Sequence, residues 1–431
     1  MAGSVKTALY RPERTSYKRK EQKFQFSREL SIRVFRPLRH KNYALFGSSD
    51  FIASVGQFVR EVALYWLAYE ITGSAIALGI LGFAEAAPRL LLGALGGVFV
   101  DRYDRLRLLT GIQFLCCLPV FALVYLYFAG ILQFWHIAVL ETALSIIRSM
   151  NPTAGQSLLR ELVPADELMS AVSLYSIGFN FARIVGPSIG GVLILWIGVG
   201  GCLVFYGVCL LISAVELLGI RLPSNAPAGV EGHFLREFTE GLRYIRATPM
   251  ICASIIGAYV ISIFVGTYTR FLAVFAKDVL HVGPEGMGLL MAAPGVGAVL
   301  SLIVLGALEE KWSRKALLWF SAKATPLLLM LFCLSRRLWL SVLLLGLFGG
   351  MQIIFRTVSR LIIQVEAPRE LLGRVMSVFL MDQGMRSLGS MVMGAFVAVC
   401  GASLGLIATS LVSMALTAIT FWHLLGVSRR D

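Results

Sequence analysis

Charged residues are scarce in this sequence of 431 residues. Asp, Glu, Lys and Arg make up 15% of the chain, whereas 57% of its residues are hydrophobic. A soluble domain carries about 25% charged residues. This composition excludes a soluble globular enzyme, a disordered protein and a disulfide scaffold. The mean hydropathy of +0.77 is typical of a chain that lies mostly inside a lipid bilayer.

Sequence patterns for catalysis and metal binding are also missing. There is no GxxxxGK[ST] phosphate loop, so a nucleotide-driven pump is not expected. There is no HExxH motif and no metal-spaced set of Cys and His, and all seven cysteines lie inside apolar runs. The first 41 residues contain no apolar core of a cleavable signal peptide. We therefore expect neither an enzyme nor a cofactor or metal site.

Long apolar runs are abundant instead. A membrane-spanning helix needs about 20 such residues, and twelve runs qualify. They lie near 43–69, 75–100, 108–129, 134–158, 170–196, 199–221, 249–276, 285–308, 315–335, 338–363, 371–398 and 402–426. The longest interruption predicts the following organisation: a basic segment 1–41, a six-helix bundle 42–221, a linker 222–248 with an amphipathic helix, a second bundle 249–426 and a tail 427–431.

Positive charge is biased to one side of these runs. Of the 39 Lys and Arg, 28 fall in the two terminal segments and in the connections after even-numbered runs, and 3 fall on the opposite side. By the positive-inside rule this bias predicts a multi-pass protein with both termini in the cytoplasm. The net charge of +14 is thus interpreted as a topology signal, and no nucleic-acid partner is expected.

The two halves of the sequence resemble each other. The segment AAP at 86–88 recurs at 292–294, GxxxDRxxR at 97–105 recurs as GxxxEKxxR at 306–314, and VPxD at 163–166 recurs as APxE at 367–370. Three matches in chain order at nearly one shift indicate a duplicated six-helix unit. Secondary transporters use such repeats and bind substrate near the membrane midplane between them.

The end of the second run, GGVFVDRYDRLRLL, resembles the loop motif Gly-x3-Asp-Arg-x-Gly-Arg-x-Arg of the major facilitator superfamily, with Asp104 in place of the usual Gly. An acid at a helix end can accept hydrogen bonds from Arg and face the N-terminus of a helix in the other half. The resemblance and its repeat imply a conformational switch; ordinary stop-transfer charge is the alternative. The switch residues would be Gly97, Asp101, Arg102, Arg105, Glu310, Lys311 and Arg314.

The fifth run contains ARIVGPSIGG, which resembles the antiporter motif of the same superfamily, Gly-x3-Gly-Pro-x2-Gly-Gly. Small residues at this spacing allow two helices to approach closely, and the proline bends the helix. The resemblance implies export, whereas a packing face without bearing on direction is the alternative. The matching residues are Gly186, Pro187, Gly190 and Gly191.

Further stretches from about residue 35 to the end, such as LVPADELMSAVSL and EGLRYIRATP, are similar to the enterobactin-exporter and macrolide-efflux branch, of transmembrane secretion effector type. The resemblance implies a monomer in the inner (cytoplasmic) membrane whose partners are a small-molecule substrate, protons and membrane lipids. Residues 1–34 match no known pattern, and we expect them to form a basic tail that meets anionic lipid.

Ionisable residues inside the spans are functional candidates, because a charge at mid-bilayer costs at least about 2.5–3.5 kcal/mol. In the first run, Gln57 and Glu61 lie within about 20° of Asp50 around a helix, which suits a water-lined cavity or a proton route. We expect one acid to gain and lose a proton as the cavity opens and closes; permanent neutralisation of Glu61 by an Arg is the alternative. The proton-coupling candidates are Asp50, Glu61, Glu85, Glu141 and Asp382.

The resemblance also implies that runs one, four, seven and ten line the central cavity, while runs two, five, eight and eleven join the halves. The substrate-cavity candidates are Gln57, Ser145, Arg148, Tyr268, Arg270, Gln352 and Arg356. Their arginines favour an acidic or oxygen-rich ligand. Two acid–Arg pairs at a spacing of four residues, Glu85 with Arg89 and Asp382 with Arg386, predict ion pairs within one helix; a proton-linked gate is the alternative.

The sequence therefore predicts an all-α integral membrane protein of the major facilitator fold, with twelve helices in two pseudo-symmetric bundles. We expect it to export a small amphipathic organic compound, such as a siderophore or drug, in exchange for protons by alternating access. A lipid or lysolipid flippase and a proton-independent facilitator on the same fold are the alternatives.

Overall fold

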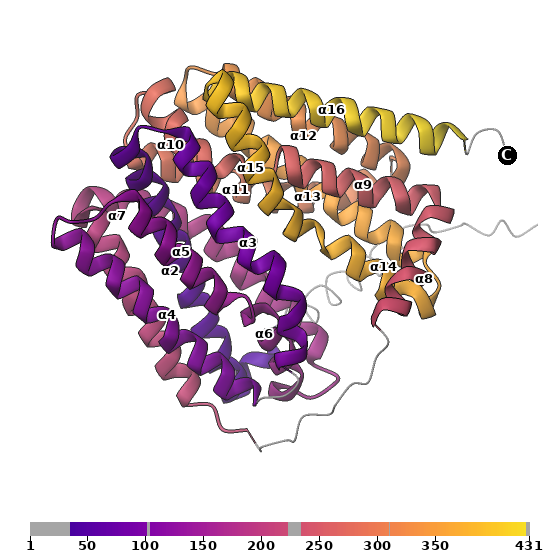
Figure 1. The fold of residues 1–431 in the computed structure, drawn as a ribbon. Coiled ribbons are helices and arrows are strands. Elements are labelled where there is room, and N and C mark those ends of the chain that lie inside the picture. Colours follow the sequence, from indigo (N-terminus) through magenta and orange to yellow (C-terminus); the bar gives the residue numbers. More distant parts are fainter. Residues whose placement is uncertain (1–34, 101–103, 223–233, 310, 428–431) are drawn as a thin grey trace, which may run out of the picture.

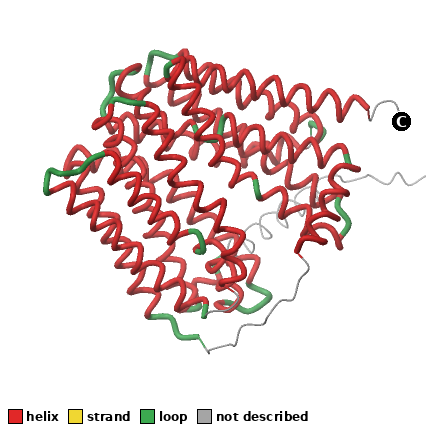
Figure 2. Tube along the Cα trace, viewed as in Figure 1, coloured by secondary structure: helices red, strands yellow, loops and turns green. Residues whose placement is uncertain are grey.

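The computed structural model of the chain describes residues 35–100, 104–222, 234–309 and 311–427. Every regular element within these ranges is helical (Figure 2). The N-terminal half contains η1 (Arg36–Arg39), α2 (Lys41–Thr72), α3 (Ala75–Val100), α4 (Arg105–Phe128), α5 (Phe134–Arg148), α6 (Asn151–Leu162) and α7 (Leu168–Leu218). Within α7 the backbone turns at Gly198, whose φ of 69° is readily adopted by glycine, so α7 holds both the fifth and the sixth predicted spans.

The C-terminal half begins with the amphipathic helix α8 (Phe234–Ala247), which packs against two helices of this half, α14 and α9. Its further elements are α9 (Pro249–Phe264), η2 (Tyr268–Phe271), α10 (Leu272–Val274), η3 (Phe275–Val279), α11 (Pro284–Glu309), α12 (Arg314–Leu334), α13 (Leu338–Glu366), α14 (Arg369–Leu380), α15 (Asp382–Cys400) and α16 (Ala402–Val427). The seventh predicted span is thus a chain of short helical pieces, from α9 to η3.

Seven of the described helical segments are long and apolar enough to cross a membrane. The other predicted spans are carried by α2, by α3, by α5 with α6, and by α14 with α15. Three of the predicted spans, 134–158, 249–276 and 371–398, are each divided into more than one helical element. In the first of these runs, Pro152 lies in the first turn of α6. A proline lacks the N–H that would continue an earlier helix, and it disfavours helical backbone in the residue before it.

The two halves pack against each other along two pairs of helices. α7 lies against α11, and α3 lies against α15. These are the fifth, eighth, second and eleventh predicted spans, the four that were expected to join the halves. The halves converge toward the end that holds α10 and diverge toward the end that holds α6 and α8 (Figure 1). Contacts between the halves are therefore concentrated at one end of the molecule.

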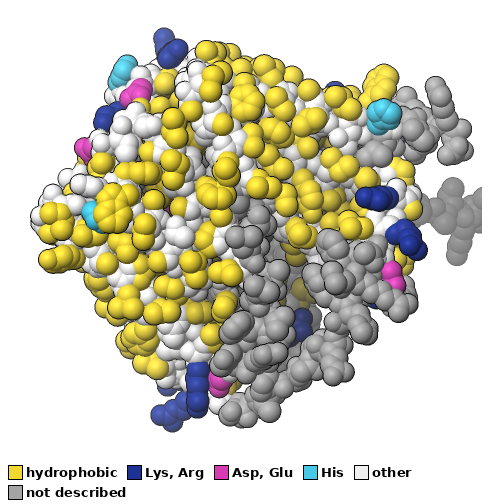
Figure 3. Space-filling model, in the orientation of Figure 1, with side chains coloured by type: hydrophobic (Ala, Val, Ile, Leu, Met, Phe, Trp, Pro, Cys, Tyr) yellow, Lys and Arg dark blue, Asp and Glu magenta, His cyan; other side chains and the backbone are white. Residues whose placement is uncertain are grey.

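The outer surface of the helices is apolar. Large hydrophobic side chains cover much of the face drawn in Figure 3, while the charged side chains visible there gather near its edges. Trp196, Ile303 and Trp422 are 81%, 73% and 81% exposed, respectively. Exposed hydrophobic area on this scale is unfavourable in water and favourable against lipid chains. The surface thus fits a protein embedded in a membrane.

Candidate functional site

Gln57 and Glu61, on one face of α2, take part in hydrogen bonds inside the N-terminal half. Gln57 donates from Nε2 to Glu61 Oε1 at 3.0 Å. Arg148 at the end of α5 donates to the side-chain oxygen of Gln57, and it donates to the Tyr206 hydroxyl at 3.0 Å. The amide of Gln57 therefore connects an acid and an arginine that both lie within predicted spans.

Arg60 and Glu141 form a buried ion pair between α2 and α5. Arg60 is 1% exposed and Glu141 is 4% exposed, and the Arg60 guanidinium carbon lies 5.3 Å from the ring centroid of Tyr206. The sequence did not predict this pair. Helix periodicity gives the direction in which a side chain leaves its own helix, but not which neighbouring helix it meets.

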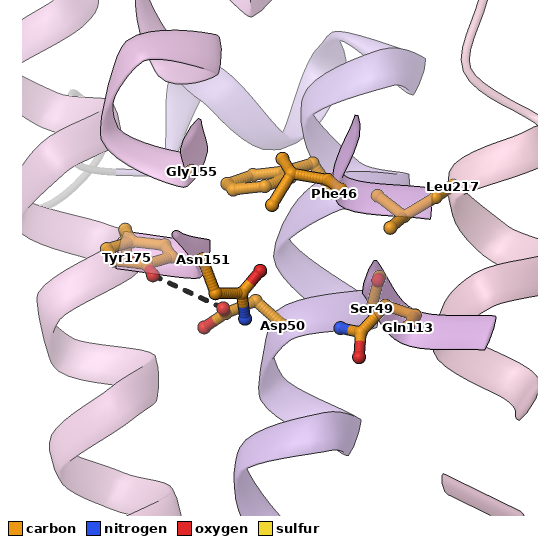
Figure 4. Close-up of a pocket in the computed structure, with 9 residues that line it drawn as sticks. Phe46, Ser49, Asp50, Gln113, Asn151, Gly155, Tyr175 and Leu217 are labelled. Atoms are coloured by element: carbon orange, nitrogen blue, oxygen red, sulfur yellow. Dashed lines mark hydrogen bonds between the residues drawn. The ribbon is translucent and has the colours of Figure 1, made fainter. Parts of the chain in front are cut away.

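Asp50 faces a small polar cavity near the beginning of α2. The cavity has a volume of about 20 Å³ and is lined by Phe46, Ser49, Asp50, Leu109, Gln113, Asn151, Gly155, Tyr175 and Leu217. Tyr175 donates to Asp50 Oδ1 at 3.2 Å, and the Asn151 side chain lies beside the carboxylate (Figure 4). Asn151 Oδ1 is buried and accepts no hydrogen bond from any described residue. A cavity of this size holds about one water molecule, so a water or a carboxyl proton could satisfy this oxygen.

Glu85 on α3 is the centre of a contact between the two halves. Its Oε2 accepts a hydrogen bond from the Tyr65 hydroxyl at 2.8 Å and lies 3.3 Å from Nη2 of Arg270, which belongs to η2 in the other half. Arg270 also donates to the Ser390 hydroxyl on α15. The predicted pairing of Glu85 with Arg89 lies outside the side chains that the structure describes. Among the described residues, the acid meets an arginine that comes from the facing bundle.

A second polar contact between the halves lies at the same end of the molecule. The Tyr69 hydroxyl, near the end of α2, donates to Asp278 in η3. The described ion pairs at the opposite end are different, because each joins elements of one half: His40 with Glu167, and Arg374 with Glu240. Polar contacts across the halves among the described residues therefore mark the end where the bundles converge.

Asp382 forms the main ion pair of the C-terminal half. Arg356 on α13 donates to both carboxylate oxygens of Asp382, at 2.8 and 2.5 Å, and Ser262 donates at 3.1 Å. The predicted pairing of Asp382 with Arg386 within one helix is therefore wrong. Arg356 reaches the carboxylate from a neighbouring helix, and Nε of Arg386 is buried without a hydrogen-bond partner among the described residues.

The remaining cavity candidates differ in their surroundings. Ser145 is 2% exposed and donates to the backbone oxygen of Glu85, so its hydroxyl braces α5 against α3. Tyr268 is 2% exposed and its ring packs edge-on against Phe348, with the ring centroids 4.8 Å apart. Gln352 on α13 is half-buried. The structure thus places Gln57, Arg148, Arg270 and Arg356 in polar networks, and it buries Ser145 and Tyr268.

The predicted switch is only partly described. Asp101, Arg102 and Glu310 lie outside the described residues, and Gly97 is described only as part of the backbone of α3. Arg105 at the start of α4 pairs with Glu161 on α6, so it joins two helices of one half. In the repeat, Lys311 is exposed, and Arg314 is exposed and acts electrostatically on Glu366.

The glycines of the fifth span lie at close helix contacts. A Cβ on Gly186 would overlap Phe58, and one on Gly190 would lie 3.0 Å from the Cα of Val59, so both hold α7 against α2. A Cβ on Gly191 would lie 2.7 Å from the backbone oxygen of Pro284 in α11, and a Cβ on Gly288 would lie 3.0 Å from the Cα of Gly191. The backbone oxygen of Pro187 borders Gly288 at the same contact. The motif therefore joins helices both within one half and across the halves.

A family model described as transmembrane secretion effector matches residues 32–428. The chain belongs to this family of the major facilitator superfamily. The family consists of membrane transporters, so this secretion effector is a multi-pass membrane transporter and not an enzyme. The resemblance to this family inferred from the sequence motifs is confirmed.

Two of the relatives of this chain are named for the compound that they transport. The staphyloferrin A transporter of Staphylococcus aureus is 24% identical over 378 residues, which cover 84% of this chain and 90% of the relative. The enterobactin exporter EntS of Citrobacter koseri is 25% identical over 323 residues, which cover 72% of this chain and 70% of that one.

Solved structures match this secretion effector at the level of the fold. A bacterial homologue of the human lysosomal transporter Spinster, in an inward-facing conformation, matches with a TM-score of 0.67 at 15% identity. The match covers 89% of this chain and 97% of that one. The predicted fold class, twelve helices in two pseudo-symmetric bundles, is confirmed.

Proposed function

We propose that the protein is a proton-coupled antiporter that exports a small amphipathic organic compound, such as a siderophore or drug, across the cytoplasmic membrane. Both termini lie in the cytoplasm in this proposal, as the distribution of Lys and Arg predicts. The names of the two relatives, a staphyloferrin A transporter and an enterobactin exporter, support a siderophore-like substrate and outward transport.

The observation that carries the proton coupling is the contact of Glu85 with Tyr65 and Arg270 across the halves. A carboxylate holds this arginine through charge and hydrogen bonding, whereas a protonated carboxyl holds it more weakly. Protonation of Glu85 would therefore loosen the closed end of the molecule. With cytoplasmic termini this end faces outward, so protons arriving from outside would favour opening toward the outside.

Asp50 is the second proton-coupling candidate with supporting geometry. It lies near the cytoplasmic end of α2 in the proposed orientation, in a cavity that it shares with Asn151. A protonated Asp50 could donate to the unpartnered Asn151 Oδ1, whereas an ionised Asp50 could not. The cavity therefore suits an acid that changes its protonation state within one turnover.

Gradient-driven transport in proteoliposomes tests the proposal. Vesicles with an acidic lumen are given ethidium or enterobactin outside, and accumulation is followed for wild type, Glu85→Gln, Asp50→Asn and the control Glu240→Gln. Glu240 is a suitable control because its ion pair with Arg374 lies within one half and its side chain is 43% exposed. We expect neutralisation of Glu85 or Asp50 to reduce gradient-driven accumulation at least tenfold, while exchange at equal pH continues.

The same experiment distinguishes the alternatives. Flux through the wild type that ignores the pH gradient would identify a proton-independent facilitator. Movement of a labelled lysolipid between leaflets, with no movement of either solute, would identify a flippase. If both acid variants accumulate solute as well as the Glu240→Gln control does, the assignment of proton coupling to Glu85 and Asp50 is wrong.

A further inference from the structure

Two arginines lie where the halves meet. Arg183 comes from α7 in the N-terminal half, and Arg386 comes from α15 in the C-terminal half. Neither forms an ion pair with a described side chain, whereas the neighbouring Arg270 and Arg356 are each paired with an acid. Arg356, Arg183 and Arg270 oppose the charge of Arg386, and only Asp382, which Arg356 already holds, favours it. This junction therefore carries an excess of positive charge.

Tyr268 in η2 is the third polar residue of this junction. Arg183 and Arg386 both act electrostatically on its hydroxyl. Tyr268 is 2% exposed, yet its oxygen has no hydrogen-bond partner among the described residues. A buried hydroxyl without a partner lowers the stability of the fold. Packing against Phe348 holds the ring in this position, so two buried polar atoms, the Tyr268 hydroxyl oxygen and Nε of Arg386, are left without a partner among the described residues.

The two arginines occupy nearly equivalent positions of the duplicated unit. The repeat that relates Ser173 to Ser377 has a shift of 204 residues, and Arg183 is separated from Arg386 by 203. Arg183 lies in the fifth predicted span, and Arg386 lies in the eleventh, which is its counterpart in the second half. Each half thus contributes one arginine to the junction. Such an arrangement suits a ligand that is held from both sides, near the midplane where transporters with repeats bind substrate.

We propose that Arg183, Arg386 and Tyr268 form an anion-binding site that receives an acidic oxygen group, such as a carboxylate, of the exported molecule. This inference rests on the proposed function and narrows its substrate class to organic anions. Guanidinium groups bind carboxylates with paired, charge-assisted hydrogen bonds, and a tyrosine hydroxyl can donate one more. A lipid phosphate offers similar oxygen atoms, so the experiment compares the two sources.

Binding to the full-length protein in nanodiscs of neutral lipid tests the site. Citrate is the soluble probe, its trimethyl ester is the neutral control, and lysophosphatidylglycerol is the lipid probe. The variants are Arg183→Gln, Arg386→Gln and Tyr268→Phe, with Lys323→Gln as the matched control, because Lys323 lies over the ring of Trp319 away from the junction. A hydrogen bond to a charged group is worth about 1.5–3 kcal/mol, so each Arg variant should bind citrate at least tenfold more weakly.

Thermal unfolding separates a binding role from a structural one. Because two unpaired cations repel each other and Arg270 and Arg356, Arg183→Gln and Arg386→Gln should raise the melting temperature of the ligand-free protein. Both variants should abolish the rise in melting temperature that citrate gives the wild type and Lys323→Gln. A lower melting temperature of the ligand-free Arg variants would show that the two arginines are structural, and the proposal would be wrong.

The remaining outcomes are also decisive. Equal binding of citrate and its trimethyl ester, or unchanged citrate binding by the Arg183→Gln/Arg386→Gln double variant, would overturn the anion site. If the lysolipid binds and citrate does not, the assignment of the anion site to a soluble substrate is wrong. Gradient-driven flux of ethidium without citrate binding would remove this inference but leave the proposed function standing. Citrate binding without gradient-driven flux of any solute would remove the proposed function but leave the anion site standing.

Discussion

Two buried acids of the N-terminal half have ion pairs of different kinds. Glu141 pairs with Arg60 inside one half, whereas Glu85 pairs with Arg270 across the halves. Movement of the two bundles as rigid bodies would leave the first pair intact and separate the second. We therefore predict that Glu141, although a proton-coupling candidate by position in the sequence, stabilises the bundle instead of carrying protons.

The size of the effect follows from burial. Because Arg60 is 1% exposed and Glu141 is 4% exposed, Glu141→Gln leaves a guanidinium in the interior without its counter-charge. Loss of one partner of a buried ion pair costs about 3–5 kcal/mol. Gln retains an oxygen that accepts a hydrogen bond, so we expect about 3 kcal/mol, and a similar loss for Arg60→Met. Replacing both charges, with Arg60→Met and Glu141→Leu, should restore stability to within about 1 kcal/mol of wild type.

A double-mutant cycle of wild type, Arg60→Met, Glu141→Leu and the double variant measures this coupling, with Glu141→Gln measured beside it. Unfolding free energies are determined in mixed micelles with sodium dodecyl sulfate as the denaturant, and gradient-driven flux is measured on the same proteins. The expected losses correspond to a coupling energy of about 5 kcal/mol, and we expect pH-driven flux by the double variant. If the two single variants lose stability additively in the double variant, Arg60 and Glu141 do not stabilise the fold as a buried ion pair. A stable Glu141→Gln protein that exchanges solute but ignores the pH gradient would show that Glu141 carries the proton.

Two further predictions concern the closed end of the molecule. Gly191→Ala places a methyl group 2.7 Å from the backbone oxygen of Pro284, so it should weaken closure between the halves and increase labelling of cavity residues from the outside. The control is Gly178→Ala on the same helix, where a Cβ meets no atom within 4 Å; equal labelling of the two variants would contradict the contact. Tyr69→Phe removes one hydrogen bond to Asp278 and should increase the same labelling by about tenfold, since such a bond to a charged acceptor is worth about 1.5 kcal/mol; unchanged labelling would count against a role in closure.

The spans were predictable because the bilayer imposes a length and an apolar composition on each of them. The breaks inside spans four, seven and eleven were not predicted, although Pro152 marks the first. A helix can end inside a membrane protein where neighbouring helices satisfy its backbone groups. Hydropathy does not report those neighbours, and it therefore gives one run where the structure has two helices.

The ion pairs were the least predictable part of the candidate site. The spacing of four residues correctly placed Asp382 and Arg386 on one helix, but Arg356 from α13 takes the carboxylate with two short hydrogen bonds. An isolated helix offers an acid only the partners of its own sequence, whereas a bundle adds partners from several helices. Arg386 therefore lacks the partner that the spacing within its own helix predicts, and neither Arg386 nor Arg183 was predicted as a ligand contact.

The distribution of charge suits a transporter whose two halves move between two conformations. Alternating access needs bundles that keep their shape and contacts between them that can be exchanged. The Arg60–Glu141 pair lies wholly inside one bundle, whereas Arg270 reaches across to the other. An anion held between Arg183 and Arg386 would add a contact that exists only when substrate is bound. A loaded and an empty transporter would then differ in the interactions between their halves, and a ligand shifts a conformational equilibrium only through such a difference.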